Sequence, residues 1–332
     1  MRIGYLGAGT WGYCLASLLA GKGYQVRLWT RDAQMACQLN QQKKHPRLPQ
    51  GRFEGDLKVT TDLAAVLKDA DLVVESVTSE GIRPVFAEVK RIGLPCCPVI
   101  VTSKGIEQNT GLILSDAVVE VLGGSSRSLV GILSGPGYAA EVIQGLPTSV
   151  VGSAYDAQVM KALCEAFTSE TFRVYPNSDM RGIAFGGALK NIIAIACGIS
   201  DGLQLGSSSK AALTTRGLHE ICKLGVSLGC RVETLYGLAG MGDIFLTCSS
   251  QLSRNFRYGY LMAQGRTPQE AMKEIGMVIE GAYTCVSALQ LAKKQNIAMP
   301  IAEVVQKIIQ GELQPSEAVR ALMQRTIKEE HL

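Results

Sequence analysis

Three glycines in a G-x-G-x-x-G pattern constrain the N-terminal fold more than any other feature of the sequence. The pattern reads Gly7-Ala8-Gly9-Thr10-Trp11-Gly12, between an apolar run at residues 2–6 and a helical pattern that extends to residue 21. Between a strand and a helix, the first glycine permits a tight turn, the second lets the backbone approach a pyrophosphate, and the third lets helix and strand pack closely. The N–H groups at the helix N-terminus attract phosphates. The motif predicts a dinucleotide site, with a purely structural glycine turn as the alternative.

Strand and helix patterns alternate through the first half of the chain. Apolar runs predict strands at residues 2–6, 25–29, 57–60, 71–74, 99–102, 129–133, 149–152 and 172–175. Helical patterns occupy residues 11–21, 33–42, 63–68, 110–122 and 138–144. This alternation predicts a parallel sheet with helices on both faces, a Rossmann-like doubly wound domain over residues 1–176. Residues 43–55, which contain Pro46 and Pro49, are predicted to form a surface loop.

After residue 176 the strand pattern stops and helical runs follow. They cover residues 180–200, 210–228, 255–263, 268–275, 283–295, 301–310 and 316–328. The predicted fold class is therefore α/β, with the doubly wound N-terminal domain followed by an all-α domain over residues 177–332. A length of 332 residues agrees with two domains. The apolar run at 182–200 approaches the length of a membrane span, but Lys190 at its centre favours a buried helix, so we expect no membrane span.

Charge, histidine and cysteine usage exclude several classes of protein. A net charge of +4, from 33 basic and 29 acidic residues, predicts no nucleic-acid partner. The only histidines, His45, His219 and His331, exclude a His-rich metal site, and no G-x-S-x-G motif accompanies them. None of the ten cysteines forms C-x-x-C, so we expect no metal and reduced thiols. Without a signal-peptide pattern, we expect a cytoplasmic protein. The adjacent Cys96-Cys97 pair has no predicted role.

The residues after the second predicted strand bear on the choice of coenzyme. A carboxylate at this position binds the ribose hydroxyls of NAD, whereas an arginine suits the 2′-phosphate of NADP. The chain reads Thr30-Arg31-Asp32, so both chemistries are present. We expect NADPH or NADH as the cofactor and favour NADPH because of Arg31. The alternative is that Arg31 is a solvated residue at a helix start.

Two further strand ends carry residues suited to ligand binding. Ligands bind at the carboxyl ends of strands in open parallel sheets. Lys104 follows the strand at 99–102 and would place an ammonium where cofactor and substrate meet. Gly135 and Gly137, in Ser134-Gly135-Pro136-Gly137, allow close backbone approach and predict an anion nest. A surface lysine and an ordinary turn are the alternatives.

The helix pattern at 182–200 contains the strongest catalytic candidate. Lys190 is its only charge and is followed by Asn191. A buried ammonium is costly unless it has a partner or titrates to the neutral form, and a lysine with a lowered pKa is a competent acid and base. Its small helical neighbours predict room for a substrate beside the ammonium: Gly186, Gly187, Ala194 and Cys197. A snorkelling lysine at a close helix contact is the alternative.

Two later motifs supply partners for that lysine and for an anionic substrate. Asp243, after Gly240-Met241-Gly242, is a natural partner for Lys190, and Thr247 follows it by four residues. The sequence Ser253-Arg254-Asn255 offers a hydroxyl, a guanidinium and an amide, which together suit a phosphate or carboxylate. The same three residues also read as a helix N-cap.

With these motifs in order, the chain resembles the bacterial NAD(P)-dependent glycerol-3-phosphate dehydrogenases. The resemblance runs nearly end to end, through the glycine motif, Thr102-Ser103-Lys104-Gly105, Ser134-Gly135-Pro136, Gly186-Gly187-Ala188-Leu189-Lys190-Asn191, Gly240-Met241-Gly242-Asp243, Ser253-Arg254-Asn255 and Val278-Ile279-Glu280-Gly281. It implies reversible reduction of dihydroxyacetone phosphate to sn-glycerol 3-phosphate, feeding glycerophospholipid synthesis.

The resemblance also implies roles for individual residues. Lys190 would be the proton donor or acceptor, oriented by Asp243. Substrate contacts would come from Lys104, Gly135, Gly137, Lys190, Asn191, Asp243, Thr247, Ser253, Arg254 and Asn255. Cofactor contacts would come from Gly7, Gly9, Thr10, Trp11, Gly12, Arg31, Lys104, Ala139, Arg254, Val278 and Glu280.

Two departures from the family pattern and two alternatives accompany this prediction. The family usually has Val-Pro-Ser at the end of the fourth strand, where this chain reads Glu75-Ser76-Val77-Thr78-Ser79 with no proline and an added carboxylate, and often Thr or Ser where it has Gly137. One alternative is a β-hydroxyacid dehydrogenase that uses the same lysine on a helix, with a carboxylate in place of the phosphate at Arg254. Another is a non-catalytic dinucleotide sensor or structural protein, which would need no buried lysine. The apolar helix surface of the second domain predicts a homodimer.

Overall fold

The N-terminal half of the protein is built around one eight-stranded sheet. The structure is a computed structural model that describes residues 1–51, 55–327 and 329–330. Within these residues the strand order is β3-β2-β1-β4-β5-β6-β7-β8. The strands are β1 (Arg2–Leu6), β2 (Gln25–Trp29), β3 (Leu57–Thr60), β4 (Leu72–Glu75), β5 (Val99–Val101), β6 (Val130–Ser134), β7 (Thr148–Ala154) and β8 (Phe172–Pro176). The predicted N-terminal α/β fold is confirmed.

The predicted all-parallel sheet is wrong at one position. Strands β1 to β6 pair in parallel, but β7 runs antiparallel to β6, and β8 follows the direction of β7. The connection from β6 to β7 contains only the short helix α6 (Ala139–Val142), which lacks the length of a crossover. The strand pattern alone gave no information about this reversal.

Helices cover both faces of the sheet. Residues Ile3 and Tyr5 of β1 face one apolar cluster and Leu6 faces the other, as the period of two in a strand requires. The helices of this half are α1 (Thr10–Gly21), α2 (Ala33–Gln42), α3 (Leu63–Leu67), α4 (Ile82–Ile92), α5 (Leu114–Leu122), α6 and α7 (Ala157–Phe167), with 3₁₀ turns η1 (Ser79–Gly81) and η2 (Gly124–Leu129).

Two of these helices differ from the prediction. Helix α4 was not predicted, and its Pro84 lies in the first turn, where proline is tolerated. The prediction began α5 four residues early, because Ile106 pairs with Ile113 as an isolated antiparallel bridge before the helix starts. Of the loop predicted at 43–55, residues 52–54 lie outside the described residues.

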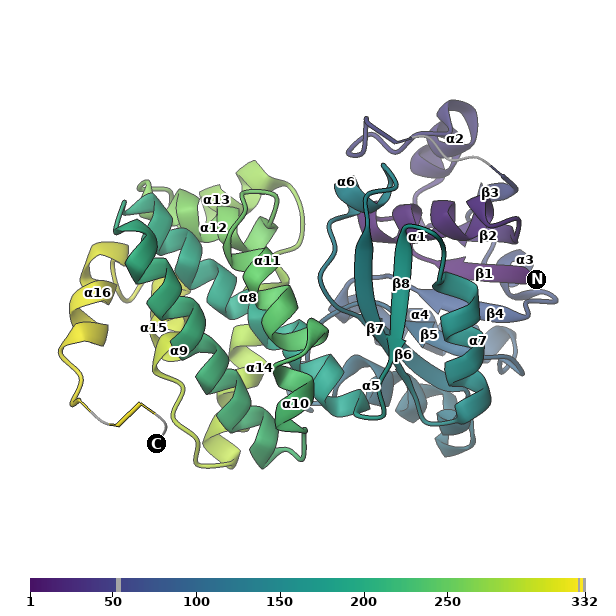
Figure 1. The fold of residues 1–332 in the computed structure, drawn as a ribbon. Coiled ribbons are helices and arrows are strands. Elements are labelled where there is room, and N and C mark those ends of the chain that lie inside the picture. The colour runs from purple at the N-terminus through teal and green to yellow at the C-terminus, as the bar shows by residue number, and fades with distance from the viewer. Residues whose placement is uncertain (52–54, 328, 331–332) are drawn as a thin grey trace.

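The C-terminal half is helical and forms a separate lobe beside the sheet (Figure 1). Its elements are α8 (Met180–Gly202), α9 (Gly206–Ser227), α10 (Val232–Leu235), the π-helix η3 (Leu238–Gly242), α11 (Asp243–Cys248), α12 (Arg254–Ala263), α13 (Pro268–Ile275), α14 (Glu280–Lys294), α15 (Pro300–Ile309) and α16 (Pro315–Met323). The predicted helical C-terminal region is confirmed. The three short elements from α10 to α11 were not predicted, α16 ends before the predicted position, and Lys328 lies outside the described residues.

Helix α8 is the centre of the helical lobe. It contacts α9, α11, α12 and α14, and its apolar cluster extends to Ile132 of β6 and Val151 of β7. Glycines let α12 approach it closely: an added Cβ at Gly198 would overlap the carbonyl oxygen of Phe256. Helix α8 is long and apolar enough to cross a membrane by composition, but its most apolar 18-residue window is wholly buried inside the protein, like that of a core helix.

Candidate active site

The site lies where the carboxyl ends of β5 and β6 meet α8 and α11. Lys104 follows β5, and its ammonium donates to the backbone oxygen of Gly135, just after β6, at 2.8 Å. The same ammonium donates to Asp243 Oδ2 at 2.5 Å. Gly135 has a φ of +129°, which glycine adopts without strain. The backbone oxygen of Gly135 therefore binds a cation, the Lys104 ammonium, which differs from the anion nest predicted there.

Lys190 projects from α8 to the other oxygen of the same carboxylate. Its Nζ donates to Asp243 Oδ1 at 2.5 Å and to Thr247 Oγ1 at 2.6 Å. Asp243 and Thr247 lie four residues apart on α11, which puts them on one helix face. The Asp243 side chain is 1% exposed, that of Lys190 is 9% exposed and that of Lys104 is 19% exposed. Lys190 therefore forms the floor of the site and Lys104 lies nearer to solvent.

Glycines bring α11 next to Lys190. An added Cβ at Gly186 of α8 would lie 2.8 Å from the carbonyl oxygen of Ala239 in η3. At Gly187 it would lie 2.5 Å from Ser134 Oγ and 3.6 Å from Lys104 Cδ. Protein atoms thus occupy the space directly beside these two glycines. The room for a substrate at the ammonium stays a prediction.

The local charges set the proton affinity of Lys190. Burial lowers its pKa to about 8, Asp243 opposes this shift, and the ammonium of Lys104 adds to it. Two ammonium groups and one carboxylate leave one positive charge in the cluster near neutral pH. Such a cluster favours a developing negative charge on a bound substrate and provides a proton close to it.

The glycine turn fits a dinucleotide phosphate. Gly7 has a φ of +105°, and an added Cβ there would lie 2.6 Å from the backbone oxygen of Ser76. At Gly12 an added Cβ would overlap the backbone oxygen of Gly7. At Gly9 it would meet no atom within 4 Å among the described residues. The turn is thus tightly packed at Gly7 and Gly12 and open at Gly9. The open side lies at the N-terminus of α1, which begins at Thr10.

Trp11 explains the glycine at position 137. An added Cβ at Gly137 would lie 3.2 Å from Trp11 Cη2, so the missing side chain makes room for the indole ring. Ala139 begins α6 directly beyond this contact. The departure of Gly137 from the family pattern therefore accommodates Trp11, and the structure puts Gly137 next to this predicted cofactor residue rather than next to Lys190.

Arg31 and Asp32 have different roles at the end of β2. Asp32 caps α2 by accepting from the backbone N–H of Met35 at 3.0 Å. Arg31 is exposed. The Asp32 carboxylate, on which binding of NAD would depend, thus caps the N-terminus of α2, while Arg31 is exposed to solvent.

A second group of predicted residues meets at the start of α12 and α14. Arg254 Nη1 donates to the backbone oxygen of Val278 at 3.1 Å. Glu280 accepts from Ser79 Oγ at 2.6 Å and from its backbone N–H at 3.3 Å. Burial raises the pKa of Glu280, against the effects of the Ser79 bonds and of the Arg254 charge. The Ser79–Glu280 contact joins the sheet to the helical lobe.

Asn191 and Asn255 hold these helices together. Asn255 Nδ2 donates to Asn191 Oδ1 at 2.9 Å, and its Oδ1 accepts from the backbone N–H of Gly281 at 2.9 Å. Ser253 caps α12 by accepting from the Phe256 N–H at 3.2 Å. Without a ligand, Ser253 is the N-cap of α12, Asn255 links α8 to α14, and Arg254 is exposed. The phosphate clamp at 253–255 stays a prediction.

Several residues near the site were not predicted. Ser103 donates to Glu75 and Ser79 donates to Glu280. Tyr138 donates to the backbone oxygen of Leu246 at 2.8 Å. Ser134 Oγ is buried and makes no hydrogen bond among the described residues. Ser79 and Tyr138 carry no local sequence signal, because their partners lie more than a hundred positions away.

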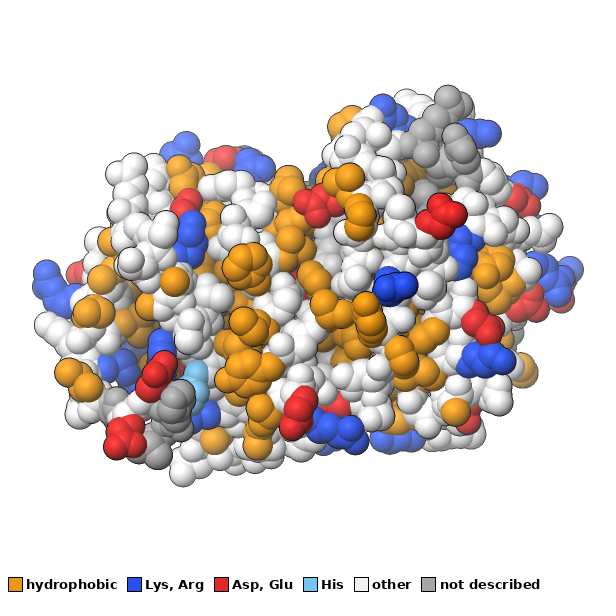
Figure 2. All heavy atoms as spheres, viewed as in Figure 1, with side chains coloured by type: hydrophobic (Ala, Val, Ile, Leu, Met, Phe, Trp, Pro, Cys, Tyr) orange, Lys and Arg blue, Asp and Glu red, His pale blue; other side chains and the backbone are white. Residues whose placement is uncertain are grey.

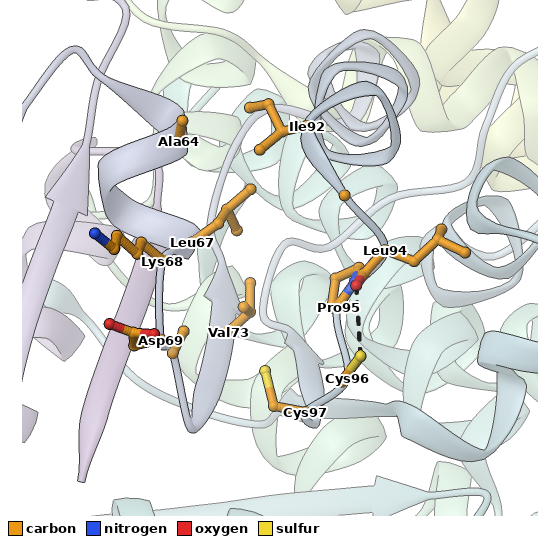
Figure 3. Close-up of a pocket in the computed structure, with 12 residues that line it drawn as sticks. Ala64, Leu67, Lys68, Asp69, Val73, Ile92, Leu94, Pro95, Cys96 and Cys97 are labelled. Atoms are coloured by element: carbon orange, nitrogen blue, oxygen red, sulfur yellow. Dashed lines mark hydrogen bonds between the residues drawn. The ribbon is translucent and has the colours of Figure 1, made fainter.

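Cys248, next to Thr247 on α11, is the cysteine close to the Lys190 cluster among the described residues. All ten cysteines are free thiols and six are buried, while Cys37 and Cys96 are exposed. Cys96 and Cys97 line a pocket with Leu67, Val73 and Leu94, in front of β5 (Figure 3). This pocket is at the amino ends of the strands, opposite Lys104. Within the described ranges no three His, Cys, Asp or Glu side chains group as a metal site.

Fold and site together define a class of protein: a nicotinamide-dependent dehydrogenase with a Rossmann domain and a helical lobe that carries a buried lysine. The family model for the NAD-dependent glycerol-3-phosphate dehydrogenase N-terminus matches residues 2–160, and the C-terminus model matches residues 179–320. The chain therefore belongs to the NAD-dependent glycerol-3-phosphate dehydrogenase family, which is a family of oxidoreductases that use NAD or NADP.

Individual relatives agree with this assignment over their full length. Glycerol-3-phosphate dehydrogenase [NAD(P)+] of Protochlamydia amoebophila is 62% identical, over 100% of this chain and 99% of the relative. The Chlamydia caviae protein of the same name is 52% identical over the same shares. The crystal structure of glycerol-3-phosphate dehydrogenase from Coxiella burnetii has a TM-score of 0.92 and 38% identity, over 98% of this chain and 99% of that one. The resemblance noted from the motifs is confirmed, and the β-hydroxyacid alternative is not favoured.

Proposed function

We propose that the chain catalyses the reversible reduction of dihydroxyacetone phosphate to sn-glycerol 3-phosphate with NADPH or NADH, and so supplies glycerophospholipid synthesis. The cluster of Lys104, Asp243 and Lys190 carries this proposal, because it puts a titratable ammonium beside the strand ends at which a nicotinamide ring binds. Family membership supports the substrate pair.

We assign a different function to each lobe. We assign dinucleotide binding to residues 1–176 and substrate binding and catalysis to residues 177–332, with the boundary between β8 and α8. Gly7, Gly9, Thr10, Trp11 and Gly12 would hold the pyrophosphate at the start of α1. Ala139, Val278, Glu280, Lys104 and Arg254 would complete the cofactor site. When bound, the cofactor supplies the hydride for the carbonyl carbon.

Lys190 moves the proton. In the reducing direction its Nζ gives a proton to the developing alkoxide, so that a ketone, a hydride and a proton together give the secondary alcohol. Asp243 and Thr247 hold Nζ in place, and Lys104 adds positive charge beside the substrate oxygens. Arg254 is the residue that we assign to the phosphate, since its guanidinium is exposed at the N-terminus of α12.

Arg31 favours NADPH over NADH. Its exposed guanidinium follows β2, where a 2′-phosphate would lie, and Asp32 is engaged as a helix cap. An arginine at this position accommodates the phosphate, whereas a ribose 2′-hydroxyl needs a carboxylate acceptor.

We also propose a cytoplasmic homodimer. Hydrophobic side chains gather on both sides of the junction between the lobes (Figure 2), and exposed large apolar residues include Tyr175, Tyr236, Met241 and Phe245. Such a surface is typical of protein contacts. Free thiols agree with a reducing compartment.

A direct assay tests the activity. Purified protein is mixed with NADPH or NADH and dihydroxyacetone phosphate, and the loss of reduced-nicotinamide absorbance is followed. Rapid loss with faster turnover for NADPH is expected. No loss with folded, coenzyme-bound protein would contradict the proposed reaction and point to a β-hydroxyacid substrate. Equal rates with both coenzymes would contradict the role of Arg31.

A further inference from the structure

Glu75 is a buried acid at the centre of the sheet edge that faces the site. It ends β4, pairs in register with Leu6 of β1 and Val101 of β5, and is 0% exposed. It belongs to the segment 75–79 that departs from the family pattern by lacking a proline and adding a carboxylate, and the catalytic cluster does not use it. A charge in such a position requires hydrogen-bond partners.

The Glu75 carboxylate ties the ends of β4 and β5 together. Its Oε2 accepts from Ser103 Oγ at 2.7 Å, and its Oε1 accepts from the backbone N–H of Val77. The backbone N–H of Thr102 donates to the backbone oxygen of Glu75 at 3.0 Å. Thr102 Oγ1 also donates to the backbone oxygen of Glu75, at 2.8 Å. The carboxylate thus fixes the segment that leads directly into Lys104.

The same strand end supports the glycine turn. An added Cβ at Gly7 would lie 2.6 Å from the oxygen of Ser76 and 3.1 Å from Val77 Cγ1. At Gly12 it would lie 3.2 Å from Ser76 Cβ. Ser76 Oγ further bonds to Tyr5 of β1 at 2.8 Å and to Thr102. The turn at Gly7 and the segment before Lys104 are therefore held against one strand end.

We propose that Glu75 is a positioning residue that fixes Lys104 relative to the dinucleotide turn. The inference rests on the proposed function, since it assigns Lys104 to the point where cofactor and substrate meet. Glu75 touches neither Lys190 nor Asp243 in the structure, so it acts through the 102–104 segment. Burial raises the pKa of Glu75 to about 7 and its hydrogen bonds oppose the rise, which agrees with a carboxylate held by donors in a dry site.

Positioning predicts a specific kinetic pattern. Loss of the Glu75 contacts would displace Lys104 and the turn, but leave Lys190 on α8 with Asp243 and Thr247. We therefore expect Glu75→Gln to raise the KM for dihydroxyacetone phosphate and the Kd of the coenzyme, each by roughly 10-fold, with kcat changed by less than about 3-fold. Ser103→Ala removes one hydrogen-bond donor to Glu75 and buries no new polar group. It is expected to raise the KM for dihydroxyacetone phosphate and the Kd of the coenzyme by about 3-fold each.

Glu220 provides a matched control. It is also a buried glutamate, and it accepts from backbone N–H groups of Ile301 and Ala302 at the start of α15, away from the site. Glu220→Gln should leave KM and Kd unchanged, whatever it does to the melting temperature. Coenzyme Kd, measured from reduced-nicotinamide fluorescence, requires no turnover, so it tests Glu75 even if dihydroxyacetone phosphate is not the substrate.

The outcomes separate the possibilities. Raised KM and Kd in Glu75→Gln and Ser103→Ala, with unchanged values in Glu220→Gln, support the positioning role. Unchanged constants in folded Glu75→Gln and Ser103→Ala overturn it, and so does an equal change in the Glu220 control. If Glu75→Gln does not fold, Ser103→Ala decides alone. Inactive wild-type protein that still shows the Kd pattern would contradict the proposed reaction and leave the role of Glu75 supported.

Discussion

Lys104 and Lys190 donate to opposite oxygens of one carboxylate, that of Asp243, each at 2.5 Å. One ammonium comes from the end of a strand and the other from the central helix of the second lobe. Asp243 thereby sets the distance between a group that faces the cofactor side and a group buried beneath it.

Removing the Lys190 ammonium should abolish most turnover. Lys190→Ala is expected to lower kcat by at least ~100-fold, the effect of losing a general acid. The measurement is steady-state reduction of dihydroxyacetone phosphate at saturating coenzyme. Lys223→Ala, an exposed lysine on α9, serves as the control and should keep wild-type kcat. Near-normal turnover of Lys190→Ala would falsify the assignment.

The pH dependence should differ between the two directions of the reaction. Because the pKa of Lys190 is about 8, reduction, which needs the ammonium, should lose rate above pH 8, and oxidation, which needs the amine, should gain rate up to that pH. Lys104→Gln removes a neighbouring positive charge, so both transitions should move to higher pH. Profiles of kcat in both directions test this. A transition that persists unchanged in Lys190→Arg contradicts it.

Arg254 should contribute to substrate binding more than to chemistry. Arg254→Ala is expected to raise the KM for dihydroxyacetone phosphate by about 10-fold or more, the worth of a charge-assisted hydrogen bond, with a smaller change in kcat. Arg257→Ala is the control, because Arg257 is exposed on the same helix and pairs with Glu274 at 3.4 Å. An unchanged KM in Arg254→Ala would argue against the phosphate contact.

The contact between α8 and α12 should be intolerant of a single methyl group. An added Cβ at Gly198 would overlap the Phe256 carbonyl, so Gly198→Ala should destabilise the protein by about 2 kcal/mol or more, since overpacking typically costs ~1–3 kcal/mol. Gly124→Ala, where an added Cβ meets no described atom within 4 Å, should be nearly neutral. Urea unfolding of both variants measures the difference. Equal stability of the two variants would refute the packing argument.

Glu220 should make the protein less stable as the pH rises from about 4.5 to 7. Burial raises its pKa to about 7, so the folded state holds a proton that the unfolded chain releases near its ordinary pKa of about 4.3. The contribution to stability is present at low pH and is lost through this window, by roughly 3 kcal/mol at most. Glu220→Gln should flatten this decline in urea unfolding at pH 5 and pH 7.5. The surface variant Glu303→Gln should not, and a decline that is identical in both variants would count against Glu220.

The sequence predicted those site features that depend on residue type at a fixed spacing. The turn at Gly7, Gly9 and Gly12 follows from local geometry, and the pairing of Lys190 with Asp243 follows from the cost of an unpaired buried charge, which few other residues could compensate. The role of Gly137 did not follow, because it depends on where the Trp11 ring lies in three dimensions.

Strand direction and contacts between residues far apart in the chain were not predicted. Nothing in the residues of β7 distinguishes a parallel from an antiparallel partner, and the reversal is decided by the short connection through α6. The Asn191–Asn255 bond was missed for a related reason. The two amides lie 64 positions apart in the chain, and their contact depends on the close approach of α8 and α12.

The exposure of Arg31 has a consequence for the history of this family. Arg31 lies outside the three hydrophobic clusters, while its neighbour Asp32 caps α2. On our proposal, a lineage could exchange one coenzyme pool for another through a single codon at position 31 with little effect on folding. Asp243 has no such freedom, because its loss leaves the buried ammonium of Lys190 without a carboxylate partner.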